Sequence, residues 1–232
     1  MNHLLKSLTV LTIAFGINPA VATAQAMQKG ISVELPVASN AIPMPFADKE
    51  DALIVTITEN GSLYFGIDLT TPSALKDEIR SGLPNRADRS LYIKADAHSP
   101  YANVQEVIDS ARASGIDSLI LLTAQTESSK PGAIVSPKGF LVQIGGSISS
   151  FSVPTTVRVL DSGGRFPDLM FNREHVSWTT QRRSFTSLFQ NLPDGQRVLI
   201  TADGLLPFAQ IVHVIEMCIV SGREIALIQP GQ

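Results

Sequence analysis

The stretch that decides the fold of this 232-residue chain is Ile93-Lys94-Ala95-Asp96, which recurs 107 positions later as Ile200-Thr201-Ala202-Asp203. Three further pairs keep this spacing: Pro100-Tyr101-Ala102 with Pro207-Phe208-Ala209, Val107-Ile108-Asp109 with Val214-Ile215-Glu216, and Ser114-Gly115 with Ser221-Gly222. The offset predicts a match without a gap from Leu91 to Leu121. Four matches in register are more than chance supplies, so the sequence predicts two copies of one small domain.

Hydrophobic periodicity predicts the same order of elements in both copies. In the first copy we expect strands at 31–36, 52–58 and 62–67, with Asn60-Gly61 as the tight turn of a hairpin. A helix opened by Thr71-Pro72, a strand at 90–95, a helix from Pro100 to Gly115 and a strand at 118–123 follow. In the second copy the corresponding pieces are expected at 140–143, 155–160, 165–171, 177–189, 197–202, 207–220 and 224–228.

These elements predict an α/β (α+β) fold class and two tandem domains. Strand–helix–strand crossovers make the later strands parallel and place both helices on one face of the sheet. We therefore expect two tandem two-layer α/β sandwiches, each ββαβαβ, at 31–124 and 139–230, joined by a linker at 125–138. The two copies are expected to meet through strand or sheet surfaces.

The N-terminal segment has the layout of a secretory signal peptide. Lys6 precedes an apolar run from Leu8 to Ile17, Asn18-Pro19 ends it, and small residues follow around Ala24 and Ala26. We interpret residues 1–26 as a cleaved signal, which predicts an exported, periplasmic protein. The alternative is an uncleaved segment that anchors the chain in the inner membrane.

Composition excludes several classes of function. The chain carries 18 Lys and Arg against 21 Asp and Glu, and no basic run that could follow a phosphate backbone, so we expect no nucleic-acid partner. A single cysteine cannot form an internal disulfide, and Cys218 falls at helical spacing with Ile211, Val214 and Ile215, as a small core residue does.

Two aspartates are the leading candidate site residues. Asp96 and Asp203 each follow a predicted buried strand and precede a helix. A carboxylate there could face a partner at the carboxyl edge of the sheet, where ligands of α/β sheets often bind. The structural alternative is that each carboxylate caps its loop or the following helix.

No catalytic or metal-binding constellation stands out in the sequence. His98, His175 and His213 are scattered, and no zinc-ligand spacing, nucleophile elbow or phosphate loop occurs. The chain is therefore expected to be non-enzymatic and to need no cofactor. One basic cluster, Arg182-Arg183 with Arg173 and Trp178, is read either as an anionic-polymer site or as a solvated helix face.

The first copy resembles the periplasmic domain of the ExbD/TolR biopolymer-transport family. The matching pieces occur in the family's order: Val33-Glu34-Leu35-Pro36, the hairpin Val55-Thr56-Ile57-Thr58-Glu59-Asn60-Gly61 with Leu63-Tyr64, Tyr92-Ile93-Lys94-Ala95-Asp96, Tyr101 with Val104, and Ala113-Ser114-Gly115. The likeness covers most of residues 31–124 and extends to 139–230 through the internal repeat. The family's membrane helix carries an aspartate for proton coupling, but residues 8–26 contain no acidic residue, so that role has no counterpart here.

The resemblance implies a scaffold that works by contact in an envelope energy-transduction system. Its implied partners are a channel subunit or a TonB/TolA-like protein, with peptidoglycan as a further candidate, and the two copies would form a pseudo-dimer or the chain a homodimer. We expect partner contacts at Val33, Glu34 and Leu35, by strand addition, and at Asp96 and Asp203. The alternative is a secreted enzyme or a small-molecule binding protein with its site between the two lobes.

Overall fold

The computed structural model describes residues 31–84, 90–124, 136–144, 155–164, 166–176, 187–189, 192–193 and 196–229. The predicted signal peptide at 1–26 and almost all of the predicted linker lie outside the described residues. So does most of the helix expected at 177–189, of which residues 187–189 are described and helical.

The first half contributes six strands, two α-helices and one short 3-10 helix to the described residues. In chain order these are β1 (Ile42–Pro43), η1 (Pro45–Asp48), β2 (Leu53–Ile57), β3 (Leu63–Phe65), β4 (Asp68–Thr70), α1 (Pro72–Gly82), β5 (Leu91–Ala95), α2 (Tyr101–Ala113) and β6 (Ser118–Thr123). The predicted turn at Asn60-Gly61 joins β2 to β3, and Gly61 has the positive φ of 82° that such a turn needs. Thr71 caps α1 as predicted, because its hydroxyl accepts the N–H of Ala74 at 3.3 Å.

The second half repeats this order where it is described. Its elements are β7 (Lys138–Gln143), β8 (Thr155–Leu160), β9 (Asp168–Phe171), β10 (Glu174–Val176), β11 (Val198–Ala202), α4 (Phe208–Val220) and β12 (Ile225–Leu227). The sequence did not predict β4 or β10, which fold back along β3 and β9 through two-residue turns. Each half therefore has a three-stranded antiparallel meander at its outer end of the sheet, β2-β3-β4 in the first half and β8-β9-β10 in the second.

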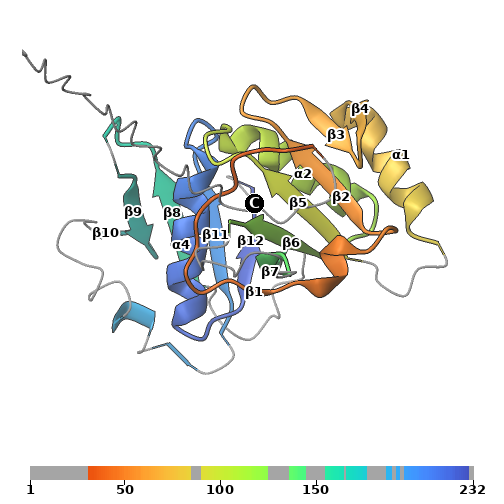
Figure 1. Ribbon diagram of the computed structural model, residues 1–232. Helices are drawn as coiled ribbons and strands as arrows, with labels where there is room; N and C mark the ends of the chain where they lie inside the picture. The colour runs from red at the N-terminus through yellow and green to blue at the C-terminus, as the bar shows by residue number, and fades with distance from the viewer. Residues whose placement is uncertain are drawn as a thin grey trace, which may run out of the picture.

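All the strands belong to one mixed sheet (Figure 1). Its order is β10-β9-β8-β11-β12-β7-β6-β5-β2-β3-β4, and β1 pairs with β7 away from this path. The α/β class is confirmed, but the two sandwiches are not separate, because their strands form one continuous sheet. The halves join edge to edge where β7 pairs antiparallel with β6, over six residue pairs, and parallel with β12.

The register of the last strands corrects one detail of the repeat. Leu91 pairs with Leu119 in the first half, whereas its counterpart Val198 pairs with Ile225 in the second. Leu119 and Ile225 are 106 positions apart, one fewer than the offset of 107. The gapless match to Leu121 was therefore wrong, since the turn after Gly222 is one residue shorter than the turn after Gly115.

The principal hydrophobic core lies on the face of the sheet that carries the helices. One buried cluster contains the inward residues of α1, α2 and α4 together with alternate strand residues from both halves, including Val55, Ile93, Leu121, Phe140, Val157 and Ile200. Because this cluster is continuous across the seam between β6 and β7, the two halves share one core.

A second, smaller core lies on the opposite face of the first half. It is formed by Ala47, Ile54, Tyr92, Ile120 and Leu122, and Leu35, Met44 and Ala52 pack against it. Much of its cover comes from residues 31–48, which we call the strap. Figure 1 shows the strap as a red-to-orange trace that reaches toward α4 and returns to η1.

The strap replaces the strand that was predicted at 31–36. Residues 31–36 correspond to β7 at the repeat offset, and one strand alone can occupy the place between β6 and β12. β7 fills that place, and residues 31–36 form no named strand. The prediction of a strand at 31–36 was therefore wrong.

Candidate functional site

Asp96 holds the first part of the strap. Its side chain, 10% exposed, lies just after β5, where Oδ2 accepts the main-chain N–H of Glu34 at 3.0 Å and Oδ1 accepts the N–H of His98 at 2.9 Å. The His98 ring lies beside the same carboxylate, with Nδ1 3.4 Å from Oδ1. The Asp96 carboxylate thus positions the strap and its own loop.

Alternate residues of the strap, Glu34 and Pro36, form main-chain hydrogen bonds with the first half. The carbonyl of Glu34 accepts the N–H of Ala97 at 2.7 Å, and the carbonyl of Pro36 accepts the N–H of Ala124 at 2.8 Å. No hydrogen bond joins the main chain of Val33 or Leu35 to the part of the chain that the structure describes. Of the three strap residues expected to add a strand, Glu34 uses its main-chain groups within the protein, whereas the main chains of Val33 and Leu35 make no such bond to the described residues.

Asp203 has the same place in the second half but a different partner. Its Oδ2 accepts the main-chain N–H of Asp161, in the turn after β8, at 2.9 Å. Its own N–H donates to the carbonyl of Val159, as that of Asp96 donates to Ile57. Each aspartate therefore organises a loop within its own half, and neither carboxylate binds the other's partners.

The loops that follow the two aspartates exchange main-chain hydrogen bonds. Tyr101 and Ala102 donate to the carbonyls of Leu206 and Gly204 at 2.8 and 2.9 Å. The counterparts of these residues at the offset of 107 make the reciprocal pair: Phe208 and Ala209 donate to Ser99 and Ala97, both at 2.9 Å. Since these are the first N–H groups of α2 and α4, each helix is capped by the loop of the other half.

Glu216 ties the strap to the second half and was not singled out from the sequence. This carboxylate is 7% exposed on α4, and its Oε1 accepts the main-chain N–H groups of Ser39 and Asn40 and the Asn40 side-chain amide, at 2.7 to 2.9 Å. A usable signal was present, because Glu216 is the one acidic residue in the otherwise largely apolar segment 208–220. A buried charge in such a helix needs a partner.

Asp109, the counterpart of Glu216, lies at a second contact between the halves. It accepts a hydrogen bond from the side-chain amide of Gln229, near the end of the described chain. Arg112, one turn further along α2, pairs with Asp109 at 2.8 Å and donates to the carbonyl of Ile144 at 2.6 Å. α2 and α4 thus each carry an acidic residue at the equivalent position, and each of these residues binds a segment that is distant in the sequence.

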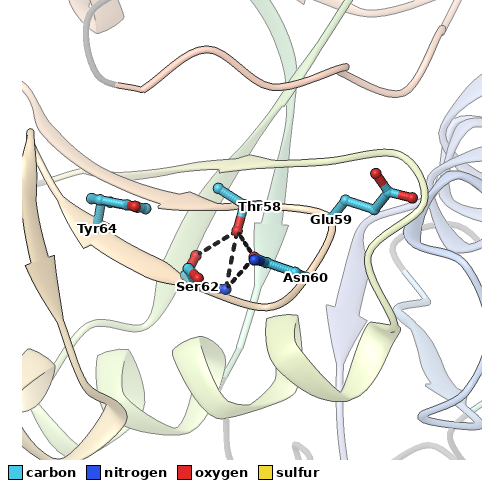
Figure 2. Close-up of a pocket in the computed structure, with 5 residues that line it drawn as sticks. All are labelled: Thr58, Glu59, Asn60, Ser62 and Tyr64. Carbon is cyan, nitrogen blue, oxygen red and sulfur yellow. Dashed lines mark hydrogen bonds between the residues drawn. The ribbon is translucent and has the colours of Figure 1, made fainter.

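An open hollow of about 500 Å³ lies at the turn between β2 and β3 (Figure 2). It is lined by Thr58, Glu59, Asn60, Ser62 and Tyr64. The Thr58 hydroxyl donates to the Asn60 side chain at 2.6 Å and accepts the Ser62 N–H at 3.0 Å, so these groups mainly satisfy one another. The lining also contains the Tyr64 side chain and the Glu59 carboxylate, which could contact a ligand.

The remaining candidate residues lie apart from these features. Cys218 is buried, and burial raises the pKa of its thiol far above the usual range, which leaves it unreactive. Arg173 and His175 lie at and beside the β9–β10 turn, while Trp178, Arg182 and Arg183 lie outside the described residues. Within the described ranges, no three His, Cys, Asp or Glu side chains gather as a metal site would require.

The fold places this protein among the α/β proteins, and its candidate site consists of loops and an extended segment. A family model described as "Biopolymer transport protein ExbD/TolR" matches residues 11–126, half of the chain. The chain therefore belongs to the ExbD/TolR family, whose members act in biopolymer transport. No curated protein and no solved structure matches it.

Proposed function

We propose that this protein is a non-enzymatic contact subunit of an envelope energy-transduction system, exposed to the periplasm. The match to the ExbD/TolR family supports a role in such a system. The observation that carries the mode of binding is the strap edge at Val33 and Leu35. A partner segment, from a channel subunit or a TonB/TolA-like protein, would pair with that edge by strand addition.

The strap suits strand addition because its inner edge is already fixed. Glu34 bonds to Asp96 and Ala97 through both its main-chain groups, which holds the segment against the first half. A preordered edge lowers the entropy lost when an incoming strand binds. Asp96 then serves partner binding as a positioning residue, and Asp203 performs the corresponding task for the turn after β8.

We also propose that the chain is a duplicated domain that works as a pseudo-dimer, with copies at 31–124 and 139–230. Its support is the reciprocal set of hydrogen bonds between the 97–102 and 204–209 loops, which has the form of an isologous, two-fold interface. Duplication would make permanent an interface that separate subunits form only by association.

The N-terminal segment is proposed to be a cleaved signal peptide. Among the described residues no helix is both long and apolar enough to span a bilayer. The family match starts at residue 11, within the apolar run, which keeps an uncleaved anchor as the alternative. N-terminal sequencing of the protein from its native envelope distinguishes them, since cleavage predicts a start at Gln25 or Met27.

The strand-addition proposal is tested with two substitutions at one position. Val33→Pro removes the outward N–H, whereas Val33→Ala shortens the side chain but keeps that N–H. The full chain is co-expressed with the channel subunit and the TonB/TolA-like protein of the same organism, and complexes are quantified after crosslinking in intact cells. We expect loss of one of these complexes with Val33→Pro and retention with Val33→Ala; equal yields from both variants would refute strand addition at this edge.

A further inference from the structure

The loops that follow the two aspartates bind the opposite helices in the same way. Gly204 is the counterpart of Ala97 at the offset of 107. The Gly204 carbonyl accepts the N–H of Ala102 at 2.9 Å, and the Ala97 carbonyl accepts an N–H of α4 at the same distance. The N–H groups differ, because that of Ala97 donates to the strap, at the carbonyl of Glu34, whereas that of Gly204 donates to no residue in the described ranges. Since Gly204 is partly exposed, its N–H is open to a partner.

The two aspartates differ in the same way. The Asp96 carboxylate uses both oxygens, for the N–H groups of Glu34 and His98. In Asp203, Oδ2 accepts the N–H of Asp161, and Oδ1 accepts no hydrogen bond from the described part of the chain. The second half therefore presents an acceptor and a donor on adjacent residues, where the first half uses such a pair to hold both main-chain groups of Glu34.

The main chain around Asp203 and Gly204 is fixed by the fold. The N–H of Asp203 donates to Val159 of β8 at 2.9 Å, and its carbonyl accepts the N–H of Leu206 at 3.2 Å. Leu205, within this loop, is 80% exposed. An ordered loop with an open donor, an open acceptor and an exposed aliphatic side chain is suited to bind the main chain of an extended peptide.

Two negative charges lie together at this loop. Asp161 is exposed, and one of its carboxylate oxygens accepts the N–H of Gly163 at 2.8 Å. Neither Asp161 nor Asp203 forms an ion pair with a residue that the structure describes. A basic side chain is therefore attracted to the loop, and an acidic one is repelled.

The strap of a second copy of the chain does not suit this loop. Both main-chain groups of Glu34 are already bonded within its own first half. Glu34 would also bring a third carboxylate to those of Asp161 and Asp203. Within the chain, the counterpart of residues 31–36 is β7, which lies inside the sheet. The occupant must therefore come from another protein.

We propose that Asp203 and Gly204 bind an extended, basic segment of a partner protein. One residue of that segment donates its N–H to Oδ1 of Asp203 and accepts the N–H of Gly204, an apolar neighbour packs on Leu205, and a Lys or Arg lies beside Asp161. Two main-chain hydrogen bonds and one aliphatic contact give an isolated segment a dissociation constant of about 0.1–1 mM. This site is separate from the strap edge proposed above, so either can fail without the other.

Titration of the isotope-labelled protein, purified as the full chain in mild detergent, with a capped peptide tests the site by nuclear magnetic resonance. The peptide has the sequence of residues 31–38 with Glu34→Lys, which makes it basic at the residue to be held. We expect the amide resonance of Gly204 to shift and to saturate, while that of Ala97 stays in place because its N–H is held by the strap. A shift of equal size at Ala97, or no shift at Gly204 up to about 5 mM peptide, would overturn the proposal.

Two further peptides separate the contributions of charge and main chain. The unaltered sequence, with its glutamate, should bind about threefold to tenfold more weakly than the lysine peptide. A peptide with Glu34→Pro lacks the N–H that donates to Asp203, so it should leave the Gly204 resonance unshifted. Equal binding of all three peptides would show that the site recognises neither feature, and the proposal would fall.

Variants of the protein assign the binding to the second half. Asp203→Asn keeps an oxygen for the Asp161 N–H but removes the charge, so it should reduce the preference for the lysine peptide. Leu205→Ser should weaken binding about threefold, and because Leu205 is exposed the fold should be unchanged, which circular dichroism checks. His98→Ser, at the counterpart of Leu205, is the matched control and should leave the affinity unchanged. A loss with His98→Ser as large as that with Leu205→Ser would contradict the assignment.

Discussion

Asn40 donates two hydrogen bonds to one carboxylate oxygen of Glu216, one from its main chain at 2.8 Å and one from its side chain at 2.9 Å. The two residues are 176 positions apart, on the strap and on α4. Through this contact, a segment that begins against the first half is fastened to the second half. The strap is therefore a brace between the halves as well as a cover for the smaller core.

Replacing Glu216 should loosen the strap. Glu216→Ala removes the acceptor of three hydrogen bonds, and because the donors can reach water we expect a loss of about 1–2 kcal/mol in the free energy of unfolding. Asn40→Ala removes one of the three donors and should cost about 0.5–1 kcal/mol. Urea unfolding gives the energies, and amide hydrogen exchange should show faster exchange at 37–44 in Glu216→Ala than in Asn40→Ala. Unchanged exchange there would contradict the brace.

Proline at the first turns of α2 and α4 tests the reciprocal loops. Ala102→Pro and Ala209→Pro each remove one N–H that donates to the other half, and because both residues lie in the first turn these N–H groups have no acceptor within their own helix. We expect each to destabilise the protein by about 1–3 kcal/mol and by similar amounts, since the two contacts are equivalent. Ala102→Ser and Ala209→Ser retain the N–H and serve as controls in the same thermal unfolding series. Two proline variants of very different cost would contradict the equivalence.

Arg173 lies in a backbone conformation that favours glycine. In the two-residue turn between β9 and β10, Asn172 has φ 55° and Arg173 has φ 118°. Arg173→Gly should raise the free energy of unfolding by about 0.5–1 kcal/mol, because it relieves strain in a turn for which Asn-Gly is preferred. Arg173→Ala removes the same charge but keeps a Cβ, so it should bring no such gain. Equal stabilities of the two variants would show that the backbone at this position is unstrained.

Lys94 should make stability rise with pH in the alkaline range. It is 4% exposed on β5, and burial lowers the pKa of its ammonium group below its usual value. Between the folded and unfolded pKa values the unfolded chain binds more protons, so the free energy of unfolding increases as pH approaches the unfolded value of 10.5. Lys94→Met lacks this dependence. Denaturant titrations from pH 7 to 10.5 should therefore show the stability of the wild type rising relative to that of the variant, and a constant difference would argue against the shift.

The local elements were predictable because their determinants are neighbours in sequence. Asn60-Gly61 set the hairpin between β2 and β3, and Thr71-Pro72 set the start of α1. Short-range turn and capping chemistry is sufficient for both. β4 and β10 were missed because their turns, Gly66-Ile67 and Asn172-Arg173, lack the common Asn-Gly pattern and their strands have only three residues.

The candidate site was predictable only in part. The sequence singled out Val33, Glu34, Leu35, Asp96 and Asp203 as candidate partner contacts, which stays a prediction, and it did not predict the contacts that Glu34, Asp96 and Asp203 make within the fold. That Asp96 accepts the N–H of Glu34, and that Asp203 accepts that of Asp161, depends on how loops distant in sequence meet. Glu216 and the reciprocal loop hydrogen bonds involve partners about 100 or more residues apart, which no local pattern encodes.

The sequence by itself determined the α/β class and most of the helices and strands. Periodicity and turn chemistry act over a few residues, and each half of the chain expresses them independently. The tertiary structure alone decided which half supplies the central strand. Residues 31–36 and β7 both have sequences that suit a strand, but a single place exists between β6 and β12, since each edge of a strand can pair only once. β7 lies close after β6 in the chain and pairs with it over six residues, so residues 31–36 are left to form the strap.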